Sequence, residues 1–233
     1  MASQVAEEYL ETIYNMGMEG EPVIGARLAD KFGVSRPTVT ETVRRLISHG
    51  YAVQNEDKTI ELTPRGREVT EDVLRRHRLA ERMLFDLLGM DWIQAHEQAH
   101  AIEHGMTEEL AQRISEQLNH PLTCPHGDPI PGNTTSGLAF LRERKAFRLS
   151  DAEPGEPVEI VLISEVVEDE SAVLQQVGEV GLHPRAKLTV LESNPEEGVV
   201  FQLKDARRSV PYELASKLWV TSDQSASDGA AER

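Results

Sequence analysis

Apolar residues follow two different rhythms along this chain. Over residues 4–18, 64–90 and 91–118 they recur every three or four positions, which predicts amphipathic helices. Beyond about residue 147, apolar and polar residues alternate in short runs, which predicts the strands of a small β-barrel. These runs are "EPVEIVLIS", "AKLTVLES", "VVFQLK" and "SVPYEL". The sequence therefore predicts a fold that is mainly α with β, with the helical part first.

A helix-turn-helix is predicted within "VIGARLADKFGVSRPTVTETVRRLISHGY". Gly33 ends the first helix, Ser35 caps the second, Pro37 lies in its first turn, and Gly50 stops it. "YAVQNEDKTIELT" follows, with alternating residues on both sides of a polar turn, and predicts a β-hairpin. This combination is a winged helix, in which the second helix enters the major groove of DNA and the hairpin contacts the backbone or the minor groove.

Charge supports this interpretation because it is distributed unevenly. The 233-residue chain has a formal net charge of −16, which argues against a protein that binds nucleic acid over its whole surface. Residues 22–67 are the exception, with eight basic and five acidic residues, whereas the remainder carries a net charge of −19. A helical hairpin used only for packing is the alternative, and the basic charge and the wing favour DNA binding.

The outward face of the second helix offers hydroxyl and small apolar groups, which can contact base edges and thymine methyl groups. Cationic side chains around this helix and in the wing are better suited to phosphates. Such a domain usually binds as a dimer to two half-sites. The predicted DNA-binding residues are Arg27, Ser35, Arg36, Pro37, Thr38, Thr40, Glu41, Arg44, Lys58 and Arg65.

Three sets of imidazole and carboxylate side chains share helix faces. In the largest set, the side chains fall at i, i+4, i+7 and i+8, and therefore on one face of a helix. Burying such groups without partners is costly, so their clustering predicts metal coordination. A solvated polar face is the alternative, and it is the better interpretation of any single pair. The sets are His96, His100, Glu103 and His104, then His77 and Glu81, then Glu8 and Glu11.

The stretch "HEQAH" matches the H-E-x-x-H pattern of zinc peptidases. In a peptidase, His96 and His100 would bind one zinc ion and Glu97 would act as the general base. The extended motif expects glycine where this chain has Glu103, and a winged helix has no role in peptide hydrolysis. We therefore predict that the protein is not an enzyme, with a zinc metallopeptidase as the alternative.

The cysteine content and the lengths of the apolar runs indicate the cellular compartment of the protein. The chain has a single cysteine, so it forms no internal disulfide. It contains no apolar run long enough to span a membrane, and its N-terminus lacks the apolar core of a signal peptide. We expect a cytoplasmic protein without membrane contact. "NHPLTCPHGDPIPGNTTSG" predicts an irregular connection, and the small polar residues of 222–233 predict a disordered tail.

Five segments resemble the diphtheria toxin repressor family of iron- and manganese-dependent repressors. They are "EEYLETIY", "SRPTVTETVRRL", "RRHRLAERMLFDLLGMD", "AHEQAHAIEHGM" and "GDPIPG", which occur in family order over about residues 5–132. The resemblance implies four parts before the tail: a winged helix-turn-helix domain, a helical metal-binding and dimerisation domain, a linker and an SH3-like domain. Their expected bounds are 1–64, 65–140, 141–147 and 148–221.

The resemblance also implies two divalent metal ions per subunit. The family's iron-responsive branch has cysteine where this chain has His100 and methionine where it has Glu8, whereas the manganese-responsive branch has an acidic residue at the latter position. Glutamate and histidine suit Mn²⁺ or Fe²⁺, so we expect Mn²⁺, with Fe²⁺ as the alternative. The implied primary ligands are Glu8, His100, Glu103 and His104, with Glu11 as a further candidate. The implied ancillary ligands are His77, Glu81, His96 and Glu170, with Gln176 as a further candidate.

The implied function is a homodimeric repressor that Mn²⁺ activates for binding to double-stranded operator DNA, without a small-molecule substrate. On this interpretation, His96 and His100 bind two different ions, and Glu97 has no catalytic task. The apolar residues near the end of the long predicted helix, Leu84, Phe85, Leu87 and Leu88, are candidates for the dimer interface or for the core.

Overall fold

The computed structural model describes residues 3–135, 137–167 and 169–222. Contacts between Cα atoms divide the chain into two compact units. The first unit runs to Ala139, except that Pro125–Asp128 belongs to the second, which continues from Phe140. The tail expected over 222–233 lies outside the described residues except for Ser222.

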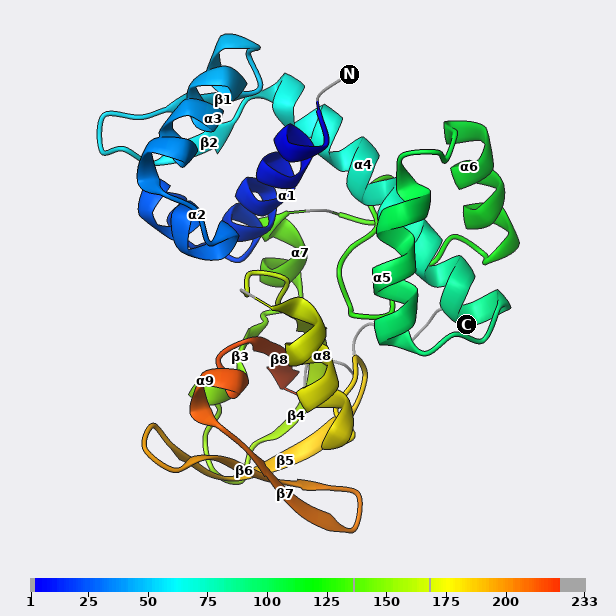
Figure 1. Cartoon of the computed structure of the whole chain (residues 1–233). Helices are drawn as coiled ribbons and strands as arrows, with labels where there is room; N and C mark the ends of the chain where they lie inside the picture. Colours follow the sequence, from blue (N-terminus) through cyan, green and yellow to red (C-terminus); the bar gives the residue numbers. More distant parts are fainter. Residues whose placement is uncertain (1–2, 136, 168, 223–233) are drawn as a thin grey trace. The chain divides into compact units, whose positions relative to one another are not determined.

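The first unit begins with three helices and a two-stranded hairpin (Figure 1). The helices are α1 (Gln4–Met18), α2 (Gly25–Phe32) and α3 (Arg36–Ser48), and the strands are β1 (Ala52–Gln54) and β2 (Ile60–Leu62). The two strands pair antiparallel, as expected for the wing.

Local signals in the sequence explain where these helices end. Gly33 ends α2 in the left-handed region, with a φ of 60°. Ser35 caps α3, and its hydroxyl accepts a hydrogen bond from the backbone N–H of Thr38 at 3.3 Å. Leu28, Val39 and Leu46 are buried between these elements. The predicted helix-turn-helix and its wing are therefore confirmed.

The rest of the first unit is a helical layer built on α4 (Pro64–Arg82). The helix predicted over 64–90 continues beyond α4 as a π-helical turn, Met83–Leu87, in which the Leu88 N–H donates to the Met83 carbonyl at 3.3 Å. Helices α5 (Trp92–Glu103) and α6 (Glu108–Gln117) follow. Apolar residues of α4, α5 and α6 and of the segments that connect and follow them form one core cluster, made of Leu79, Ala80, Leu84, Ala95, Ala99, Met106, Ala111, Ile114 and Ile130.

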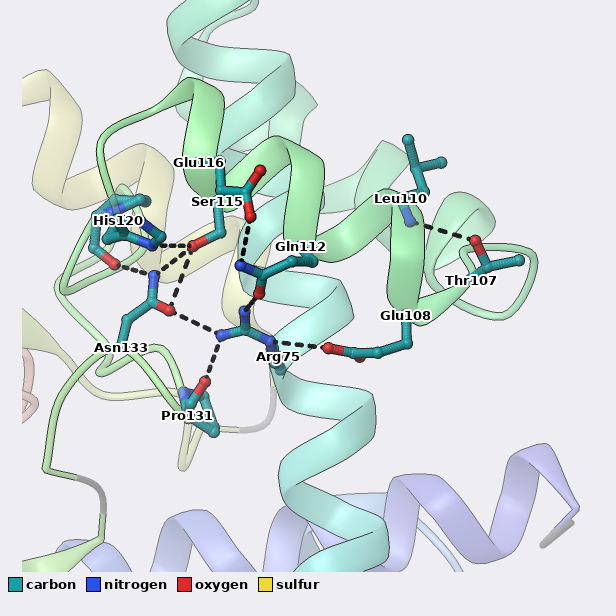
Figure 2. Close-up of polar contacts among 11 residues, drawn as sticks. Arg75, Thr107, Glu108, Leu110, Gln112, Ser115, Glu116, His120, Pro131 and Asn133 are labelled. Atoms are coloured by element: carbon teal, nitrogen blue, oxygen red, sulfur yellow. Dashed lines mark hydrogen bonds and ion pairs between the residues drawn. The ribbon is translucent and has the colours of Figure 1, made fainter.

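A buried arginine attaches α6 and the following loop to α4 (Figure 2). The Arg75 guanidinium donates to the Pro131 carbonyl at 2.7 Å, to Oδ1 of Asn133 at 2.8 Å and to Oε1 of Gln112 at 3.2 Å. Such bonds satisfy a charge that burial would otherwise penalise. They hold the stretch of α4 that also carries His77.

The second unit contains a six-stranded antiparallel sheet in the order β3-β8-β4-β5-β6-β7. The strands are β3 (Phe147–Arg148), β4 (Pro157–Ile163), β5 (Lys187–Asn194), β6 (Gly198–Leu203), β7 (Ala206–Val210) and β8 (Leu218–Ser222). Its helices are α7 (Leu138–Glu143), which begins in the first unit, α8 (Glu170–Glu179), α9 (Tyr212–Ala215) and the 3₁₀ turn Leu149–Asp151.

The strand expected over "SVPYEL" is correct only as far as Val210. Pro211 has no N–H to donate to a neighbouring strand, and it lies at the N-cap of α9. Tyr212–Ala215 therefore form a short helix instead of continuing β7. No described helix has the length and apolar character that crossing a membrane requires.

Candidate metal centre and DNA-reading surface

Helices α4 and α5 bring the predicted metal ligands together in the first unit. His77 and Glu81 come from α4, and His96 and His100 come from α5. Nitrogen atoms of His77, His96 and His100 all lie within 4.8 Å of one another. Oε1 of Glu81 lies 2.8 Å from Nδ1 of His96 and 3.2 Å from Nε2 of His77. The two helix faces that the sequence marked separately thus form one continuous cluster.

Glu103, the last residue of α5, extends this cluster towards the end of the helix. Its Oε2 lies 2.5 Å from Nδ1 of His77. Its Oε1 lies 3.3 Å from Nε2 of His104 and 3.7 Å from Nδ1 of His100. One carboxylate therefore contacts candidates for both of the implied sites.

The α1 carboxylate beside His104 is not the one that the resemblance implies. Oε2 of Glu7 lies 3.3 Å from Nδ1 of His104, whereas Glu8 is exposed and Glu11 is half-buried. Glu7 was not among the predicted ligands, because the resemblance implies the neighbouring position, Glu8. The helical spacing of "EEYLE" alone would have put Glu7 and Glu11 on one face as readily as Glu8 and Glu11.

Burial and charge shift the proton equilibria of this cluster. Burial opposes the charged imidazole of His77, but the carboxylates of Glu81 and Glu103 outweigh it and raise the pKa of His77 well above its usual range. Burial likewise opposes ionisation of Glu103, but hydrogen bonds and charges from His100 and His77 lower its pKa to about 2. The two side chains therefore form a buried ion pair around neutral pH.

The donor set fits a divalent transition metal ion. Glu81 is fully buried, and His77, His96 and Glu103 are each at most 6% exposed, so four groups that prefer water or a charged partner lie side by side in the core. Imidazole nitrogen and carboxylate oxygen are ligands for Mn²⁺, Fe²⁺ and Zn²⁺ alike. Holding such an ion requires neutral imidazoles, so protons on these histidines compete with the metal.

The two candidates from the C-terminal half belong to the second unit. Glu170 is the first residue of α8 and is half-buried, and Gln176 is exposed on the same helix. Both stay predictions as metal ligands.

The predicted DNA-reading face of α3 is open to solvent. Its hydroxyls form local bonds, since Oγ1 of Thr38 lies 2.8 Å from Oγ of Ser35 and Thr40 donates to the Arg36 carbonyl at 2.9 Å. Hydroxyl groups of this kind can hydrogen-bond to base edges. The structure exposes Ser35, Arg36, Pro37, Thr38, Thr40, Glu41, Arg44, Lys58 and Arg65, and it half-buries Arg27.

Several of the cations around this face already have anionic partners. Glu41 pairs with Arg44 at 2.6 Å and with Arg45 at 3.3 Å, and Arg27 pairs with Glu21. Ion pairs of this exposure contribute little to stability, so the arginines on α3 are available to DNA phosphates. Arg45 was not among the predicted contacts, although it lies one position beyond Arg44.

Apolar side chains are exposed where α4 ends. Leu88 is 62% exposed, Leu87 50% and Phe85 40%, whereas Leu84 is buried in the core cluster. Large apolar groups that cluster at a surface often mark an interface. The four leucine and phenylalanine candidates thus divide into one core residue and three surface residues.

Family models match most of the chain. Residues 1–60 match the model of the iron-dependent repressor N-terminal DNA-binding domain. Residues 63–132 match the model of the iron-dependent repressor metal-binding and dimerisation domain. Residues 147–222 match the FeoA domain.

Individual relatives align over nearly the whole length. The iron-dependent repressor IdeR of Mycobacterium tuberculosis is 35% identical over 215 residues, which cover 90% of this chain and 93% of the relative. The diphtheria toxin repressor of Corynebacterium diphtheriae is 33% identical over 189 residues, which cover 80% of this chain and 84% of the relative.

Solved structures agree with this fold. The IdeR of T. acidophilum superimposes with a TM-score of 0.75 at 28% identity, over 96% of this chain and 100% of that one. A manganese-dependent transcriptional repressor in complex with manganese superimposes with a TM-score of 0.77 at 28% identity, over 93% of this chain and 99% of that one.

Proposed function

The chain belongs to the iron-dependent repressor family, which its sequence segments already resembled, and on this premise we propose that Mn²⁺ activates it for binding to operator DNA. Its relatives are transcriptional repressors rather than enzymes, so the H-E-x-x-H match at His96 is a coincidence of helical spacing. One observation carries the proposal. Buried imidazoles and carboxylates of α4 and α5 converge in a chain whose winged helix exposes a recognition surface.

The choice of Mn²⁺ rests on the chemistry of the donors. The cluster on α4 and α5 is built from imidazole and carboxylate groups, which include the hard oxygen ligands that Mn²⁺ accepts. Fe²⁺ is the alternative, because it accepts the same groups. Zn²⁺ would bind more tightly by the usual order of affinities, so Mn²⁺ would be selected through geometry and availability.

We assign the ligands to two ions per subunit. The primary set is Glu8, His100, Glu103 and His104, with Glu11 as a further candidate, and the ancillary set is His77, Glu81, His96 and Glu170, with Gln176 as a further candidate. The proximity of His77, His96 and His100 would also suit a single shared ion. The stoichiometry of bound Mn²⁺ distinguishes these arrangements, and we expect two ions per subunit.

The proposed gating follows from which elements carry the ligands. Glu8 lies on α1, which packs in the winged helix, whereas His100, Glu103 and His104 lie at the end of α5. Holding one ion between them would reduce the freedom of α1 relative to α5. The two recognition helices of a dimer would then keep a spacing that fits two half-sites. Metal and DNA would bind with positive and reciprocal coupling.

The family's helical domain is a dimerisation domain, and operator DNA and a second copy of the chain are the partners that the family indicates. We propose that Phe85, Leu87 and Leu88 form part of the interface between the two copies, because they are exposed apolar residues on that domain. A regulator of this kind works on chromosomal DNA, so we keep the cytoplasm as its expected location.

The experiment that tests the function is DNA retardation by metal-depleted full-length protein. The probe is a duplex selected from a random-sequence pool by the protein in Mn²⁺, and the cations Mn²⁺, Fe²⁺ and Zn²⁺ are compared without oxygen at moderate salt. For each cation, the free concentration that causes retardation is compared with the concentration that the cell supplies. We expect this ratio to be lowest for Mn²⁺, and we expect no retardation in the presence of a chelator. Equal retardation with and without metal would contradict gating, and metal binding without retardation would indicate a metal-storage protein.

A further inference from the structure

The segment that follows α3 contacts the N-terminal end of α4. Thr63, the N-cap of α4, donates through its hydroxyl to the Gly50 carbonyl at 2.7 Å and through its N–H to the Tyr51 carbonyl at 3.0 Å. The Tyr51 N–H in turn donates to the Leu46 carbonyl of α3 at 2.9 Å. We call this contact between residues 49–51 and 63–66 the α3–α4 joint.

Gly66 shows how closely the two backbones approach. A Cβ atom added at Gly66 would lie 1.9 Å from the Tyr51 carbonyl oxygen and 2.7 Å from the Tyr51 carbonyl carbon. Only glycine fits without a backbone shift, although glycine is unfavourable inside a helix. The close approach to residue 51 therefore explains a glycine in the first turn of α4.

The joint contains more contacts than capping requires. An N-cap needs only the bond from the Gly66 N–H to the Thr63 hydroxyl, which is 3.0 Å long. In addition, Arg65 donates to the His49 carbonyl at 3.2 Å, and its guanidinium lies 5.0 Å from the centre of the Tyr51 ring. These extra contacts all reach the segment that ends the recognition helix.

Helix α4 also connects to the elements that carry the candidate metal ligands. It bears His77 and Glu81 itself, and hydrogen bonds join it to α1. The Tyr14 hydroxyl donates to Oε1 of Glu71 at 3.1 Å, and the buried Arg78 donates to Oδ1 of Asn15 at 3.3 Å. By contrast, the chain path from α3 to α4 runs through a hairpin whose strands have three residues each. The hydrogen bonds of the joint therefore connect α3 to α4 more directly than the chain path through the hairpin does.

We propose that Thr63 and Gly66 are positioning residues of the metal response, because they make the recognition helix α3 move with α4. Ordering of α1, α4 and α5 then fixes the orientation of the DNA-reading face. This inference rests on the proposed function and adds the contact by which the metal-bearing helices act on the recognition helix.

Two pairs of variants of the full-length protein test it. Thr63→Val removes the hydroxyl and keeps the branched shape, whereas Thr63→Ser keeps the hydroxyl. Gly66→Ala adds a Cβ against Tyr51. Gly17→Ala adds one within α1, where no described atom lies within 4 Å apart from its chain neighbours and the backbone of its own helix. The readout is the gain in affinity for the selected duplex on adding Mn²⁺, together with the Mn²⁺ affinity measured without DNA.

We expect Thr63→Val and Gly66→Ala to reduce the metal-induced gain by roughly ten-fold, within the usual range of allosteric coupling. Thr63→Ser and Gly17→Ala should keep the wild-type gain, and Mn²⁺ affinity without DNA should change by less than about two-fold in all four. A general loss of folding would lower Mn²⁺ affinity as well, so it is distinguishable. If Gly66→Ala does not fold, the Thr63 pair decides.

A full metal-induced gain in Thr63→Val, or equal losses in Thr63→Val and Thr63→Ser, would overturn the inference and leave the proposed function intact. No gain in the wild-type protein would overturn the proposed function itself, and the inference with it.

Discussion

Oε2 of Glu103 lies 2.5 Å from Nδ1 of His77, so the side chain of the last residue of α5 contacts a side chain of α4. Both residues are at most 5% exposed. Buried groups of opposite charge stabilise each other only as long as both are present. The same two groups are candidate metal ligands, so the contact links the protonation, the stability and the metal affinity of the helical domain.

Replacing Glu103 should therefore weaken metal binding. We expect Glu103→Gln to lower Mn²⁺ affinity by at least about ten-fold, because it removes an anionic oxygen that faces three histidines. Isothermal titration of the metal-depleted protein measures this. Glu97→Gln is the matched control, since Glu97 lies exposed on the same helix and should change metal affinity and DNA binding by less than about two-fold. Similar losses in both variants would rule out the assigned role of Glu103.

The stability of the metal-free protein should depend on pH through this pair. The pKa of Glu103 is lowered from 4.5 to about 2, so its contribution is present above pH 4.5 and is lost as pH falls towards 2. The pKa of His77 is raised above 6.5, so its contribution is present below pH 6.5 and is lost as pH rises through the raised value. The ion pair therefore contributes its full stabilisation between pH 4.5 and pH 6.5, the ordinary pKa values of the two groups.

Urea unfolding at a series of pH values, from about pH 5.5 upwards, checks this expectation. The wild-type protein should lose more stability than His77→Gln as the pH rises along this series. If both proteins lose the same amount, the pair does not titrate as described.

The α1 ligand can be identified by replacing each of two neighbouring carboxylates in a separate variant. We propose that Glu8 binds the primary ion, whereas Glu7 lies 3.3 Å from His104 in the structure. Glu8→Gln should then reduce Mn²⁺ affinity by more than about 100-fold, because the loss of an outer-shell partner alone costs roughly 10- to 100-fold, and Glu7→Gln should have a smaller effect. The opposite order would transfer the ligand role to Glu7.

An introduced charge should separate the two copies of the dimer. Leu88→Glu puts a carboxylate on the exposed apolar cluster at the end of α4, and burying it against a second copy would be costly. Sedimentation equilibrium should show a dissociation constant raised by at least ten-fold, on the order of the effect of an interface hot spot. Val53→Glu alters an equally apolar and 44% exposed residue of the wing, and it should leave the dimer unchanged.

Much of the fold was predictable because its signals are local. The hydroxyl of Ser35, the glycine at position 33 and the apolar period of α3 each depend only on neighbouring residues. The π-helical turn Met83–Leu87 was not predictable from the spacing of apolar residues. Its hydrogen bonds run from residue i to residue i−5, but a single turn of five residues is too short to show an apolar period of its own. Tyr212 and Leu214 looked like strand residues, and Pro211 decided the outcome.

From helical spacing alone, the candidate site was predictable only within each helix, and it was the family resemblance that grouped His77 and Glu81 with His96. Spacing showed that His96 and His100 share one face of α5 and that His77 and Glu81 share one face of α4. It did not show that the two faces meet, because helix packing depends on contacts distant in sequence, such as the buried cluster around Leu79 and Ala99. The contact between Glu7 and His104 spans α1 and the end of α5, so it had no local signal.

The reciprocal coupling of metal and DNA tests the central claim most directly. Mn²⁺ affinity of the full-length protein is measured with and without a saturating amount of the selected duplex, and DNA affinity is measured with and without Mn²⁺. We expect both affinities to rise by the same factor, in the range of about 5- to 150-fold. An Mn²⁺ affinity that is identical with and without the duplex would contradict metal-gated DNA binding.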